Sequence, residues 1–270
     1  MTQTLNLVTL DPHEYQSVRP LFADLKFYRP FLECILTHRC DGKVVVDDRL
    51  NPSFALVVCP PRPANLYAPV YFAGEFNENI LPYLKSFTKI SLLASLDWNH
   101  RALFEEADFI PNERMQLRRP DPSFEMAFWD IPKQYSLSPI NEKNFKQCNW
   151  HAFIAGSFGS DERFFKNGVG FCLTDQGKIA SESYAIVAGD LAEIGVVTDE
   201  AYRGQNLGTC ICAKTLDYCY QRQIDPVWNC DINNFGSVAI AKKLGFQEDV
   251  RYLYLNWIAP KVSTHSSIAL

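Results

Sequence analysis

The stretch that decides the fold is Val197-Thr198-Asp199-Glu200-Ala201-Tyr202-Arg203-Gly204-Gln205-Asn206-Leu207-Gly208-Thr209. The apolar run at residues 193–198 predicts a buried strand before it, and a helix is predicted over residues 205–222. Free backbone N–H groups at a helix N-terminus, left accessible by small residues, form a site for phosphate oxygens, and the helix dipole adds to the attraction. The segment therefore predicts either a pyrophosphate-binding turn or a plain strand-to-helix turn in which the glycines permit tight geometry.

A second segment further along the chain makes the first more specific. It reads Asn234-x-x-Ser237-x-x-Ile240-Ala241-Lys242-Lys243-Leu244-Gly245-Phe246, and the chain contains neither G-x-G-x-x-G nor G-x-x-x-x-G-K-S/T. Residues 197–208 resemble the acyl-coenzyme A-binding motif of the GNAT N-acetyltransferase superfamily, whose pattern is Gln/Arg-x-x-Gly-x-Gly/Ala. Residues 234–246 resemble the second motif of that superfamily. Together with Pro226-x-Trp228-x-Cys230, they resemble the branch similar to the zwittermicin A resistance acetyltransferase.

The resemblance implies an α/β (α+β) GNAT fold with a central mixed, mostly antiparallel sheet, preceded by an α/β N-terminal domain. We expect residues 1–122 to form that domain, which is structural or walls the acceptor site. Residues 123–260 would form the N-acetyltransferase domain, and residues 261–270 a flexible tail. Three prolines and a cluster of charges place the junction between residues 110 and 122.

Hydrophobic patterns predict the elements of both halves. In the first half, helices are predicted over residues 13–26, 80–87 and 99–107, with strands over 43–47, 54–59 and 67–72. In the second half, strands are predicted over residues 124–129, 169–174, 178–187, 193–198, 226–231 and 250–257, with helices over 144–158, 205–222 and 237–244.

The composition indicates a globular protein that can bury a large core, since 47% of the 270 residues are hydrophobic and 21% are charged. A net charge of −5 argues against nonspecific nucleic-acid binding. No run is long enough to span a membrane, and no secretory leader is recognisable at the N-terminus. Nine scattered cysteines suit free thiols in a reducing compartment, so we expect a cytoplasmic protein; the sequence does not indicate its oligomeric state.

The resemblance also implies where acetyl-CoA, the acyl donor, would bind. The strand before the turn would pair with the pantetheine arm through Val196, Val197 and Thr198, and Asn234 would contact the same arm. The pyrophosphate would be cradled by Arg203, Gly204, Gln205, Asn206, Leu207, Gly208 and Thr209. Asn206 stands where the motif has glycine, but asparagine tolerates positive φ better than most residues. No metal is implied.

The chemistry requires an uncharged amine next to the donor, so a carboxylate or a water chain must take the proton of the ammonium. Glu193 is the expected base because it lies on the strand that leads into the cleft, although it also fits an exposed carboxylate at a strand end. Glu182 and Asp231 are weaker candidates for the base, and Tyr184 is a candidate proton donor. Ala241 occupies the position at which many superfamily members have a proton-donating tyrosine.

Cysteine clusters offer two other interpretations. Cys34, His38 and Cys40, or Cys210, Cys212 and Cys219, could suggest a metal site, but neither group has paired C-x-x-C spacing. We expect these cysteines to be small buried hydrophobes. A Cys230 nucleophile would require a histidine brought in by folding.

We therefore expect an enzyme that transfers an acetyl group from acetyl-CoA to a primary amine of a small molecule, by direct attack in a ternary complex. The alternatives are a protein N-acetyltransferase and a catalytically silent acyl-CoA-binding sensor.

Overall fold

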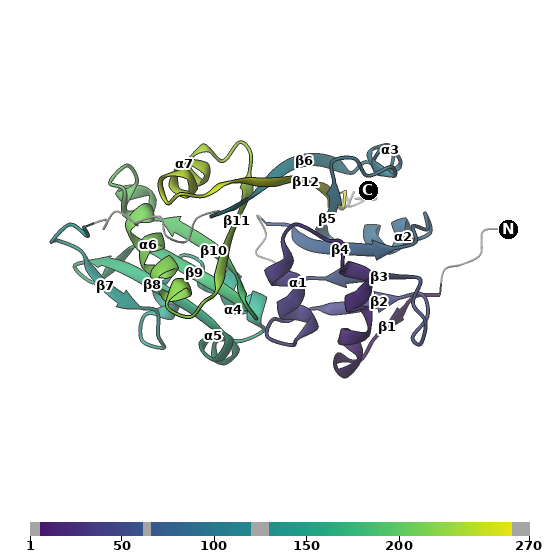
Figure 1. Cartoon of the computed structure of the whole chain (residues 1–270), viewed down its shortest axis with the longest axis horizontal. Helices are drawn as coiled ribbons and strands as arrows, with labels where there is room; N and C mark the ends of the chain where they lie inside the picture. Colours follow the sequence, from purple (N-terminus) through teal and green to yellow (C-terminus); the bar gives the residue numbers. More distant parts are fainter. Residues whose placement is uncertain (1–5, 62–65, 120–129, 261–270) are drawn as a thin grey trace, which may run out of the picture.

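The computed structural model describes residues 6–61, 66–119 and 130–260. Its strands form one sheet in the order β1-β2-β3-β4-β5-β12-β6-β11-β10-β9-β8-β7. In Figure 1 the first half of the chain lies to one side of the molecule and most of the second half to the other, with β6 and β12 running between them. The predicted GNAT-like α/β fold with a mixed, mostly antiparallel sheet is confirmed, because among the described strands only β4–β5 and β10–β11 pair in parallel.

The first half contains six strands and the helices between them within its described residues. They are β1 (Val8–Thr9), the 3-10 helix η1 (Pro12–Phe22), α1 (Arg29–Leu36), β2 (Lys43–Val46), β3 (Phe54–Val58), β4 (Ala68–Gly74), α2 (Ile80–Lys85), β5 (Lys89–Ser95), α3 (Arg101–Glu106) and β6 (Ile110–Arg118).

The second half repeats much of this order, starting at β7. Its elements are β7 (Ser136–Pro139), η2 (Phe145–Gln147), α4 (His151–Phe158), α5 (Asp161–Asn167), β8 (Gly168–Asp175), β9 (Lys178–Ala188), β10 (Leu191–Thr198), η3 (Glu200–Tyr202), α6 (Leu207–Tyr220), β11 (Asp225–Asp231), α7 (Phe235–Lys243) and β12 (Gln247–Ile258).

Each half runs through an antiparallel meander, a helix, a strand parallel to the last one of the meander, a second helix and a final strand. The final strands are exchanged between the halves. β6 pairs with β11 of the second half, while β12 pairs with β5 of the first half, and β6 and β12 also pair with each other. The exchange joins the two halves into one continuous sheet.

Local sequence explains how the meander of the second half forms. Gln176 and Gly177 both have positive φ, 46° and 85°, which is the geometry of a two-residue hairpin turn between β8 and β9. One face of β9 and β10 packs on α6 through Ala185, Ala192 and Ile194. The opposite face packs on α1 of the first half, so the meander is covered on both sides.

Most predicted elements are found within a few residues of their expected bounds, but three expectations were wrong. Residues 110–118 are not a junction; they form β6 in the middle of the sheet. The helix expected over 13–26 is the shorter 3-10 helix η1 with Pro20 inside it. The helix expected over 144–158 is split into η2 and α4.

Several elements had no sequence-based prediction, namely β1, α1, β5, α5 and β7. The strand expected over residues 124–129 and the tail expected at 261–270 lie outside the described residues. The interpretation of the cysteines is confirmed, because all nine are free thiols and buried.

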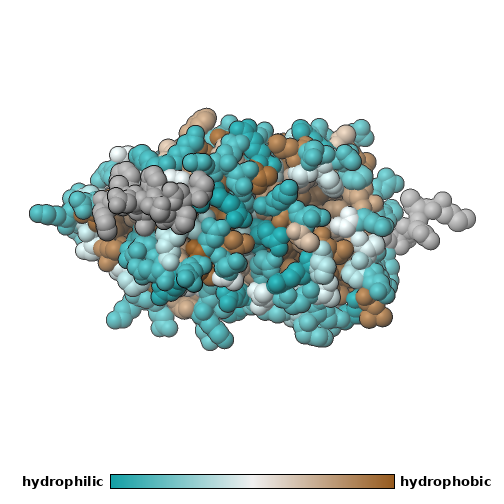
Figure 2. Space-filling model, in the orientation of Figure 1, coloured by the Kyte–Doolittle hydropathy of each residue, from teal (hydrophilic) through white to brown (hydrophobic). Residues whose placement is uncertain are grey.

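The described residues contain no helix with the length and apolar character that a membrane span requires. The face shown in Figure 2 is mostly hydrophilic, and its apolar side chains form separate patches.

Candidate active site

The site begins where β10 and β11 separate. These parallel strands are paired only at Leu191↔Asp225, Ala192↔Pro226 and Glu193↔Val227. Beyond Glu193, β10 stays paired with β9 as far as Thr198, while β11 follows β6 as far as Asp231. One edge of β10, residues 194–198, therefore has no strand partner among the described residues, and its backbone groups are available to a ligand. We call this opening the open wedge.

A cavity of about 1260 Å³ fills the open wedge. Most residues expected to hold the donor line it: Val196, Val197, Thr198, Arg203, Gly204, Asn206, Leu207, Gly208, Thr209 and Asn234. The exception is Gln205, which does not line the cavity; its Oε1 accepts a hydrogen bond from the Tyr135 hydroxyl at 2.6 Å. Trp150 and Phe153, at the start of α4, contribute aromatic walls.

The turn into α6 presents its backbone N–H groups to this cavity. Gly204 has φ +80°, and Asn206, the N-cap residue of α6, has φ +61°. The carbonyl of Asn206 accepts from the N–H groups of Thr209 and Cys210. Among the described residues, no backbone N–H from residue 204 to residue 208 donates to another backbone group. Free N–H groups at the start of a 14-residue helix form a site for phosphate oxygens.

Lys243 of α7 adds a cation to this turn, and the sequence analysis did not select it. Its Nζ donates to Asn206 Oδ1 at 3.0 Å, and the Thr209 hydroxyl donates to the same oxygen at 2.8 Å. Asn234 is the N-cap residue of α7, where its Oδ1 accepts from the Ser237 N–H at 3.1 Å. The only sequence signal for Lys243 was its place in the second motif.

Glu193 lies at the inner end of the open wedge. Its side chain lines the cavity, and the residue is only 8% exposed, so it is not a solvent-exposed carboxylate. Asn229 of β11 donates from Nδ2 to Glu193 Oε2 at 2.6 Å. The Tyr252 hydroxyl of β12 in turn donates to Asn229 Oδ1 at 3.1 Å, which fixes the orientation of the amide.

Tyr184 lines the cavity and forms a buried pair with Glu182. The Tyr184 hydroxyl donates to Glu182 Oε1 at 3.2 Å, and Glu182 also accepts from the backbone N–H groups of Asn149 and Trp150. Burial raises the pKa of Glu182 and that of Tyr184. Glu182 does not line the cavity and anchors the start of α4 instead.

The other candidates have structural partners. Asp231 lines the cavity, and it accepts from Asn112 Nδ2 at 2.7 Å and from the Asn233 N–H at 2.7 Å. Burial raises the pKa of the Cys230 thiol, which disfavours the thiolate that a nucleophile requires. Ala241 is fully buried in the core below α7. Within residues 6–61, 66–119 and 130–260, His, Cys, Asp and Glu side chains form no group of three that could hold a metal.

The cavity extends beyond the predicted residues toward β6, β12 and the first half of the chain. Tyr28, Phe31, Asn112, Arg114, Tyr254 and Asn256 also line it. Tyr28 and Phe31 were missed because α1 was not predicted, and Asn112 and Arg114 because residues 110–122 were interpreted as a junction. Tyr254 and Asn256 lie on a strand that was predicted, but no motif marks them.

Comparison with known proteins agrees with this geometry. The family model for GNAT acetyltransferase matches residues 19–255. The uncharacterized N-acetyltransferase YdfB of Bacillus subtilis is 27% identical over an alignment of 263 residues that covers 91% of this chain and 97% of that protein.

Two solved structures share the fold. The GCN5-related N-acetyltransferase-like protein from Streptococcus suis has a TM-score of 0.74 at 22% identity, covering 91% of this chain and 99% of that one. A tandem GNAT protein from the clavulanic acid biosynthesis pathway has a TM-score of 0.61 at 14% identity, covering 93% and 98%.

The open wedge, the free N–H groups at the start of α6 and the match over most of the chain define an acyltransferase enzyme. The chain belongs to the GNAT acetyltransferase family, whose enzymes use acetyl-CoA as acyl donor.

Proposed function

We propose that this enzyme transfers the acetyl group of acetyl-CoA to a primary amine of a small molecule, by direct attack and without a covalent enzyme intermediate. The observation that carries the proposal is the continuity of the cavity. The same cavity is lined by the N-terminal turn of α6 and by the buried carboxylate of Glu193. One site can therefore hold a phosphate-bearing donor and deprotonate an acceptor beside it.

The donor-binding residues fit acetyl-CoA by their chemistry. The N–H groups of residues 204–208 and the cation of Lys243 suit its pyrophosphate, and the free edge of β10 at Val196 to Thr198 suits its amide-bearing arm. Asn234 lies at the other side of the wedge. Bound acetyl-CoA supplies an activated thioester carbonyl, and a β10 backbone N–H is the group that we assign to polarise it.

Glu193 is the proposed general base. A lysine-like amine has a pKa of about 10.4 and is protonated at neutral pH, so the base must remove a proton before attack. Asn229 holds one oxygen of Glu193 by a hydrogen bond, which orients the carboxylate toward the cavity. Tyr184 is a weaker candidate, as a proton donor, because its hydroxyl already donates a hydrogen bond to Glu182. We propose that the leaving thiol needs no tyrosine at position 241.

The test of this proposal is Glu193→Gln, assayed by thiol release from acetyl-CoA over a panel of primary amines. We expect kcat to fall by about 10²- to 10⁴-fold at neutral pH. The loss should shrink as pH rises, because more of the amine is then uncharged. Glu106→Gln, on the exposed side of α3, is the matched control and should keep full activity. Unchanged turnover of the Glu193 variant at every pH would remove Glu193 from the mechanism.

Two features favour a silent acyl-CoA sensor as the second candidate, namely Asn206 at a glycine position and Ala241 at a tyrosine position. A sensor would bind acetyl-CoA but release no thiol with any amine. The resemblance to the zwittermicin A resistance branch motivates amine-bearing antibiotics or metabolites in the panel, and a peptide amine tests the protein N-acetyltransferase alternative. We place the enzyme in the cytoplasm, since its nine cysteines are free thiols.

A further inference from the structure

The floor of the cavity is a polar face of the sheet. Arg114 of β6 lies opposite Asp231 of β11 and opposite Tyr252 of β12, so these side chains share one face. Alternate residues of the three strands continue that face, because side chains alternate along a strand. The members of the face that line the cavity are Asn112, Arg114, Asn229, Asp231, Tyr254 and Asn256.

Arg114 differs from its neighbours on β6 because it has no acidic partner. Glu113 pairs with Arg251 at 3.0 Å, and Arg118 pairs with Asp225 at 2.9 Å. Among the described residues, Arg114 forms no ion pair, and its Nε is buried without a hydrogen-bond partner. Its guanidinium carbon lies 4.5 Å from the centre of the Tyr254 ring. A guanidinium stays charged and presents a planar set of donors, so an unsatisfied Nε at a cavity wall points to an anionic ligand.

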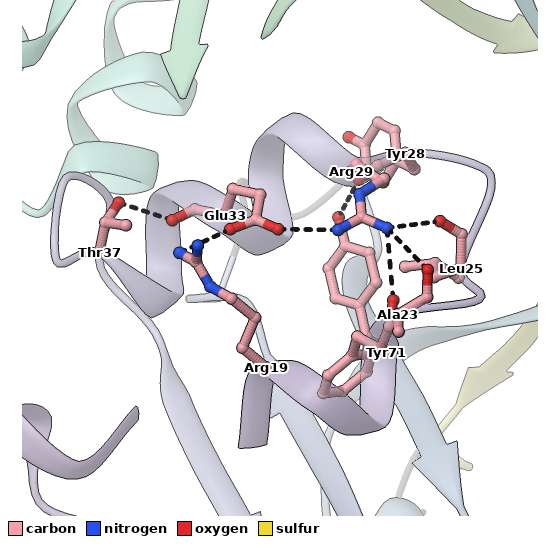
Figure 3. Close-up of polar contacts among 9 residues, drawn as sticks. Arg19, Ala23, Leu25, Tyr28, Arg29, Glu33, Thr37 and Tyr71 are labelled. Carbon is pink, nitrogen blue, oxygen red and sulfur yellow. Dashed lines mark hydrogen bonds and ion pairs between the residues drawn. The ribbon is translucent and has the colours of Figure 1, made fainter. Parts of the chain in front are cut away.

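The backbone beside Arg114 is held in a strained conformation. Tyr28 has φ +54°, a left-handed conformation that is uncommon for a residue other than glycine. The Tyr71 hydroxyl donates to the Tyr28 carbonyl at 2.8 Å, as Figure 3 shows, and the Tyr28 N–H donates to Gln116 Oε1 at 2.9 Å. A strained residue whose carbonyl and N–H are both held by hydrogen bonds is typical of functional sites.

The segment around Tyr28 is fixed by an arginine that follows it. Arg29 donates to the carbonyls of Phe22, Ala23 and Leu25 at the end of η1 and pairs with Glu33 at 3.0 Å (Figure 3). These contacts hold the chain where the Tyr28 side chain lines the cavity and meets the Tyr254 ring that the Arg114 guanidinium approaches. The strained residue is therefore part of the wall that also contains the guanidinium.

Charges in the cavity limit the anion that can bind there. Arg114 lies opposite Asp231, and Asn229 of the same face donates to Glu193, so the guanidinium and two carboxylates line one part of the cavity. A doubly charged phosphate would be repelled by the two carboxylates, whereas a singly charged carboxylate matches the planar guanidinium. A ligand with an ammonium group next to Glu193 and a carboxylate next to Arg114 would pair with both of these side chains.

We propose that Arg114 binds a carboxylate of the acceptor, and that the acceptor is an amino acid or a similar compound with a primary amine and a carboxylate. This inference rests on the proposed function, since it names the acceptor class of the same site. It requires no new chemical step, because the guanidinium only binds and orients the substrate.

The experiment compares amines that differ only by a carboxylate: lysine with cadaverine, ornithine with putrescine, and beta-alanine with ethylamine. Thiol release is measured for wild type, Arg114→Gln, Arg114→Lys and the matched control Arg118→Gln, whose arginine lies outside the cavity on the same strand. We expect wild type to prefer the carboxylated members by roughly 10- to 100-fold in kcat/KM. Arg114→Gln should remove that preference mainly through KM, and Arg114→Lys should keep part of it. Arg118→Gln should behave as wild type.

An equal loss for both members of each pair in Arg114→Gln, or no preference in wild type, would overturn the proposal. A binding measurement separates it from the proposed function. The unfolding temperature is measured in the presence of coenzyme A with either propionate or propionamide added. Propionate, but not propionamide, should raise it for wild type and Arg114→Lys, and neither compound should raise it for Arg114→Gln.

If no amine is acetylated while this pattern holds, the proposed function fails and the carboxylate site at Arg114 stands. If amines are acetylated but propionate has no selective effect and no carboxylated amine is preferred, the carboxylate site fails and the proposed function stands. If neither assay responds, both are wrong.

Discussion

Each half of this enzyme contains two parallel strands that separate after three paired positions. The space between the separating strands is filled in the first half and open in the second. In the first half, β4 and β5 are paired only at Ala68↔Ile90, Pro69↔Ser91 and Val70↔Leu92, just as β10 and β11 are paired at three positions. The space beyond β4 and β5 is packed with aromatic rings, those of Phe72, Phe76, Trp98, His100 and Phe104. We call it the filled wedge.

The turns after the two wedges differ as well. After β4, the N–H of Glu75 donates to the carbonyl of Ser53, and a Cβ at Gly74 would lie 2.2 Å from that carbonyl. The helix that follows, α2, has six residues, whereas α6 has 14. The first half thus uses its N–H groups internally, while the second half leaves them for a ligand. Topology alone therefore does not make a binding site; small residues and free N–H groups in the wedge do.

The largest effect is expected from emptying the filled wedge. Phe104 is fully buried and contacts the rings of Trp98 and Phe109, so Phe104→Ala should lower the free energy of unfolding by about 3–5 kcal/mol. Urea unfolding measures the change, and the KM for acetyl-CoA of the folded enzyme should not move. Phe235→Ala, at a residue that is 76% exposed, is the control and should stay within about 0.5 kcal/mol. If Phe104→Ala raised the KM for acetyl-CoA and left the stability unchanged, the filled wedge would take part in donor binding, contrary to the comparison of the two wedges.

The next effect is expected from filling the open wedge. A Cβ at Gly208 would lie 2.9 Å from Ile240 Cδ1 and 3.3 Å from Thr198 Oγ1, so the methyl groups of Gly208→Val would crowd the start of α6. The KM for acetyl-CoA should rise at least about tenfold, a loss of roughly 1.4 kcal/mol in binding. The exposed Gly156 of α4, where an added Cβ meets nothing within 4 Å, allows the same substitution as a control. Normal acetyl-CoA binding by Gly208→Val would mean that the donor binds elsewhere.

The smallest effect is expected at Asn206. Glycine adopts its φ of +61° without strain, so Asn206→Gly should change stability by less than about 1 kcal/mol and acetyl-CoA affinity only slightly. Alanine pays about 1–2 kcal/mol for the left-handed conformation, so Asn206→Ala should be clearly less stable. Thermal unfolding and the KM for acetyl-CoA, measured for both variants, test these two expectations. If Asn206→Gly weakens acetyl-CoA binding strongly, the contact of Asn206 with Lys243 matters more than the backbone conformation.

The sequence predicts the open wedge better than the floor of the cavity. Residues 203–208 carry a local motif, and the positive φ at Gly204 and Asn206 follows from residue types that tolerate it. β6 could not be predicted in this way. Apart from Pro111 and the exposed Ile110, only Met115 and Leu117 on that strand are apolar. Arg114 lines the cavity, and Gln116 accepts a hydrogen bond from the Tyr28 N–H. A buried polar face has the same sequence pattern as an exposed loop.

Two other features depend on contacts that no local pattern records. α1 is short, six of its eight residues are buried, and its polar face consists of Arg29 and Glu33 alone, so the periodic signal of an amphipathic helix extends over barely two turns. The exchange of β6 and β12 joins residues far apart in the chain, and the choice of strand partner is a property of the whole sheet. The function was therefore predictable from the donor turn, whereas the acceptor end required the folded chain.

The exchange of final strands also affects how the protein is made. β5 is completed only when β12 pairs with it, and β12 follows β6 in the chain only after all the elements from β7 to α7. A ribosome adds about 5–20 residues per second, so the edge of β5 stays open for on the order of ten seconds after β6 has emerged. An open strand edge invites pairing with other chains during this interval. We therefore expect the edge of β5 to need protection in nascent chains, and we expect neither half to complete its sheet before the other is made.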